Sequence, residues 1–340
     1  MLIDMHAHVL PAEFPAAGAE GWPTMEPTGQ DGARLLTAGP LRFTAQRAFF
    51  DAEQRLSAMD ASGTDAEVVS PMPPLLNYGL PPESGRDLGR WINEFIAGLC
   101  GPRPDRFFGL GTVPLQDPDL AAAELAEITK IGLAGIEIGS NVNGASLGED
   151  RFLGFFQEAE RLRIPIFVHA ASPTVTDRLP RAALGTFGFA TEIAMAAASI
   201  IASGTAEKCP GLRLAFSHGA GGFPLMLTRA QYFWGRTWNE EPQPDPSSGG
   251  AFPGGHSPAG CARRFYYDTL VFDRRALQYL IDMIGPSRLL IGSDFPAMPR
   301  EQPAGRTLRS MALPEPVLDD ITWNNCFRFL GINPPASPPA

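Results

Sequence analysis

Short apolar runs alternate along this chain with amphipathic segments. The apolar runs predict strands over residues 2–6, 66–71, 107–114, 134–139, 164–169, 212–218, 264–270 and 289–294. The amphipathic segments predict helices over 51–62, 83–100, 117–131, 149–163, 192–203, 223–237, 274–284 and 315–330. Strands that are apolar on both faces, each followed by a helix, are typical of a closed parallel barrel. The pattern therefore predicts an α/β fold, a (β/α)8 TIM barrel.

Two segments do not follow this repeat. Residues 10–50 come after the first strand and are rich in Gly, Pro and Ala, which predicts a lid or small subdomain inserted there. Residues 239–262 are rich in Pro, Gly and Ser and predict an irregular loop. Because a barrel of this kind needs roughly 250 residues and tolerates insertions, we expect one domain over residues 1–332 and a disordered tail over 333–340.

The charge balance restricts the partners. The formal net charge is -10, which argues against nucleic acid and against an anionic membrane surface. An anionic substrate would then need a local cluster of Arg, although a compositional bias accounts for most Arg residues in a chain with only Lys130 and Lys208. The four Cys are far apart and predict free thiols. Without a basic leader or an apolar stretch long enough to span a bilayer, we expect a cytoplasmic protein.

Four of the five histidines stand at the ends of predicted strands. His6 and His8 end the first run, His169 closes IPIFVH, and His218 closes LRLAFSH. A parallel barrel gathers the carboxyl ends of its strands on one face. Residues two apart on a strand point to the same side, so His6 and His8 are expected to face the barrel axis together, and Asp4 with them.

Asp294 follows the last predicted strand in the motif GSDFP. Three imidazoles, from His6, His8 and His169, and one carboxylate suit a divalent ion, Zn²⁺ first and Mn²⁺ as the alternative. A lone buried His is more often a core residue, and Asp294 would also fit as a helix N-cap. The joint placement at strand ends favours the metal site, and it leaves His218 for proton transfer.

Eight motifs occur in order along nearly the whole chain. They are IDMHAHVLP, RLSAMDASGTD, VPLQDPDL, GIEIG, IPIFVH, FSHGAGG, GSDFP and NNCFRFL. Together they resemble the amidohydrolase superfamily, and within it the decarboxylase branch (amidohydrolase family 2) typified by 2-amino-3-carboxymuconate-6-semialdehyde decarboxylase. γ-Resorcylate and 5-carboxyvanillate decarboxylases belong to the same branch.

The resemblance implies a metal-dependent, non-oxidative decarboxylase, a carboxy-lyase that acts on an aromatic or muconate-type carboxylic acid. His6, His8, His169 and Asp294 look like the metal ligands, and His218 looks like the catalytic acid/base, with Asp294 as the alternative proton carrier. The fourth strand offers Glu137 and no Lys. A carbamylated Lys bridging two metals is therefore not available there, and we expect one ion per subunit.

Three arginines are candidates for binding the substrate carboxylate. Arg229 resembles an arginine that reaches into the neighbouring subunit's site, which implies a homodimer, with a tetramer as the alternative; an exposed arginine on the helix fits it equally well. In the lid, Phe43 stands where the type enzyme has its carboxylate-binding Arg, which leaves Arg42 and Arg47 nearby. The loop after His169 also lacks the Trp of the type enzyme. Both departures weaken the case that this chain acts on the substrate of the type enzyme, and they leave the reaction class unchanged.

Other functions fit the same predicted site. A metal-dependent hydrolase of a lactone, amide or ester would use a metal-bound water, and a hydratase of an unsaturated dicarboxylate is a variant of it. A non-catalytic barrel that serves as a binding module would be expected to have lost ligands, and here the ligand set is complete.

Overall fold

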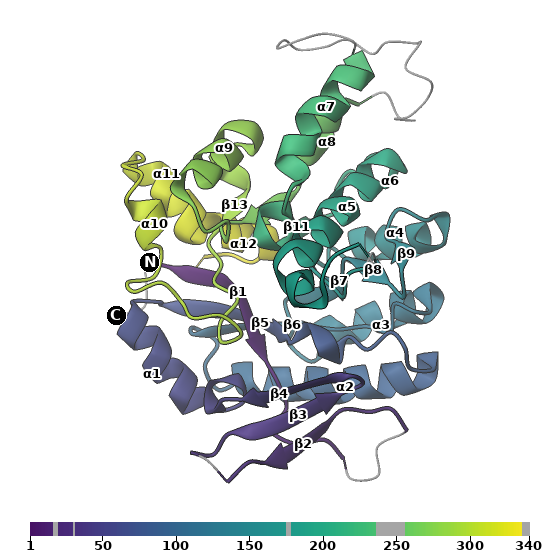
Figure 1. Ribbon diagram of the computed structural model, residues 1–340, viewed down its shortest axis with the longest axis vertical. Coiled ribbons are helices and arrows are strands. Elements are labelled where there is room, and N and C mark those ends of the chain that lie inside the picture. The colour runs from purple at the N-terminus through teal and green to yellow at the C-terminus, as the bar shows by residue number, and fades with distance from the viewer. Residues whose placement is uncertain (16–19, 30, 175–177, 236–255, 335–340) are drawn as a thin grey trace.

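Eight parallel strands form a barrel with helices on its outside (Figure 1). The computed structural model describes residues 1–15, 20–29, 31–174, 178–235 and 256–334. Around the barrel the strands follow chain order: β1 (Ile3–Val9), β5 (Ala66–Pro71), β6 (Phe107–Gly111), β7 (Gly135–Gly139), β10 (Ile166–His169), β11 (Leu214–Phe216), β12 (Tyr266–Asp268) and β13 (Leu289–Leu290). The predicted (β/α)8 barrel is confirmed, and each strand overlaps its predicted range.

Long helices cover the outside of the strands. They are α1 (Ala52–Ser62), α2 (Pro82–Cys100), α3 (Pro118–Lys130), α4 (Leu153–Arg161), α5 (Phe189–Ala202), α7 (Phe223–Gly235) and α9 (Arg274–Ile284). Three of them begin at an Asp whose side chain accepts first-turn N–H groups: Asp51, Asp117 and Asp273. The shorter helices are α6 (Thr205–Lys208), α8 (Pro258–Ala262), α10 (Arg306–Arg309), α11 (Glu315–Asp319) and α12 (Asn325–Leu330).

Two predicted segments differ in detail. The helix predicted over 315–330 is divided into α11, a π-helical turn (Asp320–Asn324) and α12. The end of the loop predicted over 239–262 is the helix α8, because Ser257 caps it by accepting the Gly260 N–H and Pro258 occupies its first turn. Residues 239–255 of that loop, and 335–340 of the predicted tail, lie outside the described residues.

The insertion after β1 contains a small antiparallel sheet. Its strands are β2 (Thr24–Pro27), β3 (Arg34–Ala38) and β4 (Leu41–Ala45). Leu36 and Ala45 are fully buried against the main core. Figure 1 shows this sheet at one end of the molecule and α7 at the other. A two-stranded hairpin, β8 (Asn141–Val142) and β9 (Ala145–Ser146), follows β7.

One continuous helical stretch, Arg181–Ala202, is long and apolar enough to cross a bilayer by length and composition alone, contrary to the expectation from the sequence. A core helix of a globular protein passes the same test, and 44% of the apolar window is buried. The buried positions within α5 include Ile193, Ala197 and Ile200, which belong to the core between strands and helices.

The interior of the barrel is filled at one end by apolar side chains. They come from alternate positions on the strands and from α12: Ile3, Met5, Ala66, Val68, Leu110, Phe167, Ala215, Leu290, Cys326, Phe327 and Phe329. Because these apolar side chains fill one end of the interior, the floor, polar side chains of the described residues converge at the other end.

A β-bulge in β1 separates the floor from that polar end. Asp4 pairs with Glu67 on β5, but Ala7 pairs with Val69, so β1 has one extra residue between these pairs. Met5 and His6 therefore both point into the barrel, while Asp4 points outward to the helix layer. The expectation that Asp4 faces the axis together with the histidines is wrong, because strict alternation is broken at this position.

Strand β13 has no regular ladder with β1, and the loop that follows it closes the barrel instead. The Asp294 N–H donates to the His6 carbonyl at 2.8 Å, and the His8 N–H donates to the Phe295 carbonyl at 2.7 Å. The seam of the barrel thus lies between the segments that carry the two predicted histidines and the predicted aspartate.

Candidate metal centre

The four predicted ligands meet at the polar end of the barrel. The Nε2 atom of His8 lies 3.2 Å from Nε2 of His6 and 3.3 Å from Nε2 of His169. Oδ1 of Asp294 lies 3.1 Å from Nε2 of His8 and 3.6 Å from Nε2 of His6. All four side chains are buried, and their ligand atoms lie within 4.8 Å of one another.

The tautomers of the three imidazoles explain what this cluster can hold. Nδ1 of His8 faces the Pro71 carbonyl at 3.1 Å, and Nδ1 of His169 faces the Ala170 carbonyl at 2.9 Å. Nδ1 of His6 faces the carboxylate of Asp268 at 2.7 Å. Each of these partners accepts hydrogen bonds, so each Nδ1 carries the hydrogen and each Nε2 presents a lone pair.

Three lone pairs and a carboxylate oxygen therefore converge with no hydrogen to share between them. Such a set repels itself unless a cation occupies the centre, and N3O donors at these separations fit a divalent ion with tetrahedral or expanded coordination. The residues present thus fit the metal that the sequence predicts, and a divalent metal site is supported here.

Protons compete with a metal for this site. Burial alone lowers the pKa of His6, but the carboxylates of Asp294 and Asp268 outweigh burial and raise it to about 9. For Asp294, burial opposes ionisation, yet the imidazoles of His6 and His8 hold its pKa far below its usual range. Without an ion, the cluster therefore takes up a proton that a metal has to displace.

Asp268, at the end of β12, is a site residue that the sequence analysis missed. Its Oδ2 accepts the hydrogen bond from His6, while its Oδ1 accepts the N–H groups of Gly219 at 2.9 Å and Leu270 at 3.0 Å. The carboxylate is fixed on three sides and orients the His6 ring. Its position at the end of the seventh strand, in RFYYDTL, was the signal that could have found it.

His218 lies beside the cluster without joining it. Its ring centroid is 5.2 Å from that of His6 and 5.4 Å from that of His169. The residue is half-buried, and within the described residues no hydrogen bond to its ring is found. Burial and the neighbouring His6 lower its pKa, so the ring is neutral at pH 7 and free to accept a proton.

The turn that presents His218 has a left-handed backbone, with φ of 53° at His218 and 57° at Gly221. A Cβ at Gly221 would lie 2.0 Å from the Ala190 carbonyl oxygen of α5. The glycine-rich turn therefore packs tightly against the helix layer.

Glu137 is a further buried carboxylate at this end of the barrel. It lies on β7, it is fully buried, and within the described residues neither carboxylate oxygen has a hydrogen-bond partner. Its Oε2 is 3.8 Å from Nδ1 of His8. Burial raises the pKa of Glu137 to about 7.

The three candidate arginines make no contact with the four candidate ligands among the hydrogen bonds and ion pairs of the described residues. Arg42 is exposed on β4, and Arg47 is exposed and paired with Asp51. Arg229 is exposed on α7, where its guanidinium lies 4.8 Å from the centre of the Phe233 ring. Among the described residues, the hydrogen bonds and ion pairs of the four ligands include none of these arginines.

A parallel barrel with a buried N3O cluster at the carboxyl ends of its strands defines a metal-dependent barrel enzyme. The amidohydrolase family model matches residues 3–332, and the chain belongs to this family.

Relatives within the family are decarboxylases. The chain is 29% identical over 339 residues to 2-amino-3-carboxymuconate-6-semialdehyde decarboxylase of Dictyostelium discoideum, covering 98% of this chain and 92% of the relative. It is 31% identical over 260 residues to γ-resorcylate decarboxylase of Rhodococcus jostii strain RHA1, covering 71% and 76%. The crystal structure of 5-carboxyvanillate decarboxylase from Sphingomonas paucimobilis superposes with a TM-score of 0.74 at 27% identity, covering 82% of this chain and 83% of that one.

Proposed function

We propose that this chain is a metal-dependent non-oxidative decarboxylase of an aromatic or muconate-type carboxylic acid. The observation that carries the proposal is the pairing of a complete N3O cluster with a neutral, unbonded His218 at the open end of the barrel. Its relatives named as decarboxylases supply the reaction class.

His6, His8, His169 and Asp294 would hold one divalent ion per subunit. Zn²⁺ is our first choice and Mn²⁺ the alternative, because both accept imidazole and carboxylate donors. Held by these residues, the ion would supply Lewis-acid chemistry, withdrawing negative charge from the oxygen atoms of the substrate.

The residues of the chain then transfer one proton to the substrate. In non-oxidative decarboxylation a proton adds to the carbon that carries the carboxylate, the bond between that carbon and the carboxylate breaks, and CO₂ leaves with no change in oxidation of the ring. His218 is placed to carry this proton: its neutral, unbonded ring can take a proton from the bound substrate or from water and pass it to the carbon. Asp294 is the alternative carrier, and its very low pKa makes it the weaker one.

Binding of the substrate carboxylate is assigned to arginine. We propose that Arg229 serves the site of a second copy in a homodimer, because it lies exposed on α7 and, among the described residues, has no hydrogen bond or ion pair with the four ligands. Arg42 and Arg47 lie on the insertion, residues 10–50, and would contribute if this segment acts as a lid. Hydrolysis of a lactone, amide or ester at the same site is the second candidate.

Substrate panels separate the candidates. Metal-loaded protein is incubated without oxygen with hydroxybenzoates, hydroxypicolinates and carboxymuconates, and CO₂ release and loss of mass are followed. A parallel panel contains lactones, amides and esters. Turnover of the first panel alone supports decarboxylation, whereas turnover of the second alone contradicts it.

A further inference from the structure

Asp4 contacts the segments that carry two of the candidate ligands, His6 and Asp294, although its side chain points away from the metal cluster. Its Oδ1 accepts the His6 N–H at 3.2 Å, so it binds the backbone of the bulge. Its Oδ2 accepts a hydrogen bond from the hydroxyl of Ser293, the residue before Asp294. One carboxylate on β1 thus holds the backbone beside one ligand and the side chain beside another.

Arg300 neutralises this carboxylate and extends the link. Its Nε donates to Oδ2 of Asp4 at 3.0 Å, and its Nη2 lies 2.9 Å from the same oxygen and also donates to Glu67. Its guanidinium covers the ring of Phe295, the residue after Asp294, with Cζ 4.3 Å from the ring centre. Arg55, which donates to Glu67, covers the same ring at 5.5 Å.

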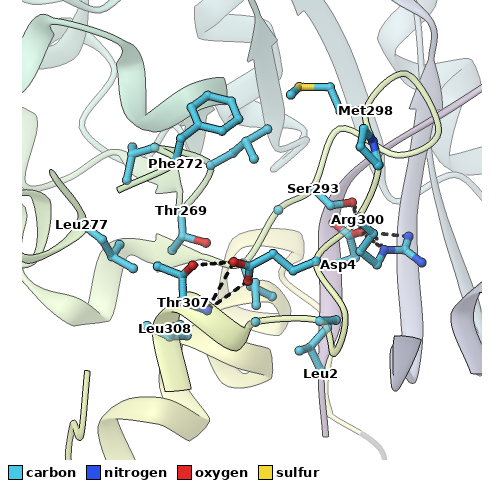
Figure 2. A pocket seen from close by; sticks show the side chains of 18 residues that line it. Leu2, Asp4, Thr269, Phe272, Leu277, Ser293, Met298, Arg300, Thr307 and Leu308 are labelled. Atoms are coloured by element: carbon cyan, nitrogen blue, oxygen red, sulfur yellow. Dashed lines mark hydrogen bonds and ion pairs between the residues drawn. The ribbon is translucent and has the colours of Figure 1, made fainter. Parts of the chain in front are cut away.

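Both flanks of Asp294 are therefore fixed from the outer side of the barrel. Figure 2 shows Asp4, Ser293 and Arg300 gathered on one wall of a cavity of about 320 Å³. The residues that line this cavity include none of the four candidate ligands and not His218. The linked residues thus face away from the place where substrate would react.

The seam explains why such a link is needed. No regular ladder joins β13 to β1, and Asp294 has a left-handed backbone, with φ of 60°. That conformation is uncommon for a residue other than glycine, and it persists only where the surroundings enforce it. Asp4, Ser293 and Arg300 supply that enforcement at the point where the seam crosses the metal cluster.

We propose that Asp4 and Arg300 are positioning residues that fix the bulge beside His6 and the loop of Asp294 relative to each other, and thereby set the affinity for the metal. The inference rests on the metal site proposed above. Residues that orient metal ligands from behind typically change metal affinity by about 10–100-fold when they are mutated.

The test measures metal affinity in the full-length protein. Metal-free wild type, Asp4→Asn, Ser293→Ala, Arg300→Lys and Arg300→Met are titrated with Zn²⁺ in competition with a chromophoric chelator. Arg90→Met is the matched control, because it removes another two-pronged pair, with Glu124 on α3, far along the chain from the seam. Co²⁺ absorption spectra of each loaded protein report the geometry of the ligands.

We expect the Zn²⁺ dissociation constant to rise about 10–100-fold in Asp4→Asn and Arg300→Met. A smaller rise is expected in Arg300→Lys and Ser293→Ala. The Co²⁺ absorption bands should change in these four variants, whereas Arg90→Met should match wild type in both measurements. Variants that melt earlier but bind the ion like wild type would show a role in folding alone and overturn the proposal. If Asp4→Asn or Arg300→Met does not fold, the two milder variants decide in the same way. Absence of binding by wild type itself would instead overturn the metal site.

Discussion

Asp268 accepts a hydrogen bond from Nδ1 of His6 at 2.7 Å, and both side chains are fully buried. This contact fixes the hydrogen of His6 on Nδ1 and aims the lone pair of Nε2 at the other ligands. Because backbone N–H groups of Gly219 and Leu270 hold the carboxylate, the turn that carries His218 and the orientation of a ligand depend on the same side chain.

Asp268→Asn is expected to weaken metal binding by about 10–100-fold, because the amide no longer selects one tautomer of His6. The metal content after dialysis against a graded chelator series measures this. Asp282→Asn is the matched control, since Asp282 lies exposed on α9 and, within the described part of the chain, accepts a hydrogen bond from Gln278 alone. Equal affinity in Asp268→Asn and wild type would contradict the orienting role.

Metal binding is expected to weaken as the pH is lowered. His6 in the metal-free cluster has its pKa raised to about 9, so below this pH the ion has to displace a proton, and each pH unit costs about tenfold in apparent affinity for one proton released. Calorimetry in two buffers of different ionisation enthalpy counts the released protons. An affinity independent of pH between 6 and 8 would be inconsistent with this competition.

The stability of the metal-free protein depends on pH in the opposite sense. Because the pKa of His6 is higher in the folded state, protonation of His6 stabilises the folded state. This stabilisation is complete below pH 6.5, the pKa of an unfolded His, and is lost as the pH rises through about 9. Thermal unfolding from pH 6 to 10 should therefore show a falling midpoint without metal. Addition of Zn²⁺ should restore the midpoint most strongly at the alkaline end.

His218→Asn is expected to bind the metal like wild type and to lose about 10²–10⁴-fold in turnover, because its ring carries the reacting proton and contacts no ligand by a hydrogen bond. Metal content and CO₂ release are measured on the same sample. The same substitution at His256, a histidine outside the cluster, is the control and should leave both metal content and turnover unchanged. Unchanged turnover in His218→Asn would assign the proton to another group, with Asp294 next.

A site shared between two subunits predicts complementation. Arg229→Ala and His218→Ala are each expected to be inactive alone, and mixing them under conditions that exchange subunits should restore part of the activity, since one site of each mixed dimer receives intact His218 and intact Arg229. Sedimentation and turnover of the mixture provide the readouts. No recovery in a mixture shown to contain hybrid dimers would place Arg229 outside the partner's site.

The sequence predicted the barrel and the convergence of the four candidate ligands because both depend on local periodicity. His6 and His8, two residues apart, had to share a face, and His169 and Asp294 ended apolar runs whose ends meet in any parallel barrel. Asp4 was misplaced for a different reason. The bulge that turns it outward is enforced by Ser293 and Arg300, nearly 300 residues away in the chain, and local alternation contains no information about it.

Other site residues were hidden for related reasons. Asp268 is a single carboxylate at the end of a short strand, and its role appears only when His6 is placed beside it. The last strand was predicted to reach Asp294 but ends at Leu290, because the following residues leave the sheet to bond with β1. The proposed roles of Arg42, Arg47 and Arg229 involve a substrate and a second subunit, and these roles remain predictions.

Among the described residues, apolar side chains close the floor of the barrel beneath the candidate ligands. Met5 and Phe167 lie fully buried beneath the cluster, and the ring of Phe167 meets that of His6 edge to face at 5.0 Å. The half-buried His218 stands on the open side. If a cation is bound and exchanges on the side of His218, a molecule seated over His218 is expected to slow its extraction by chelators.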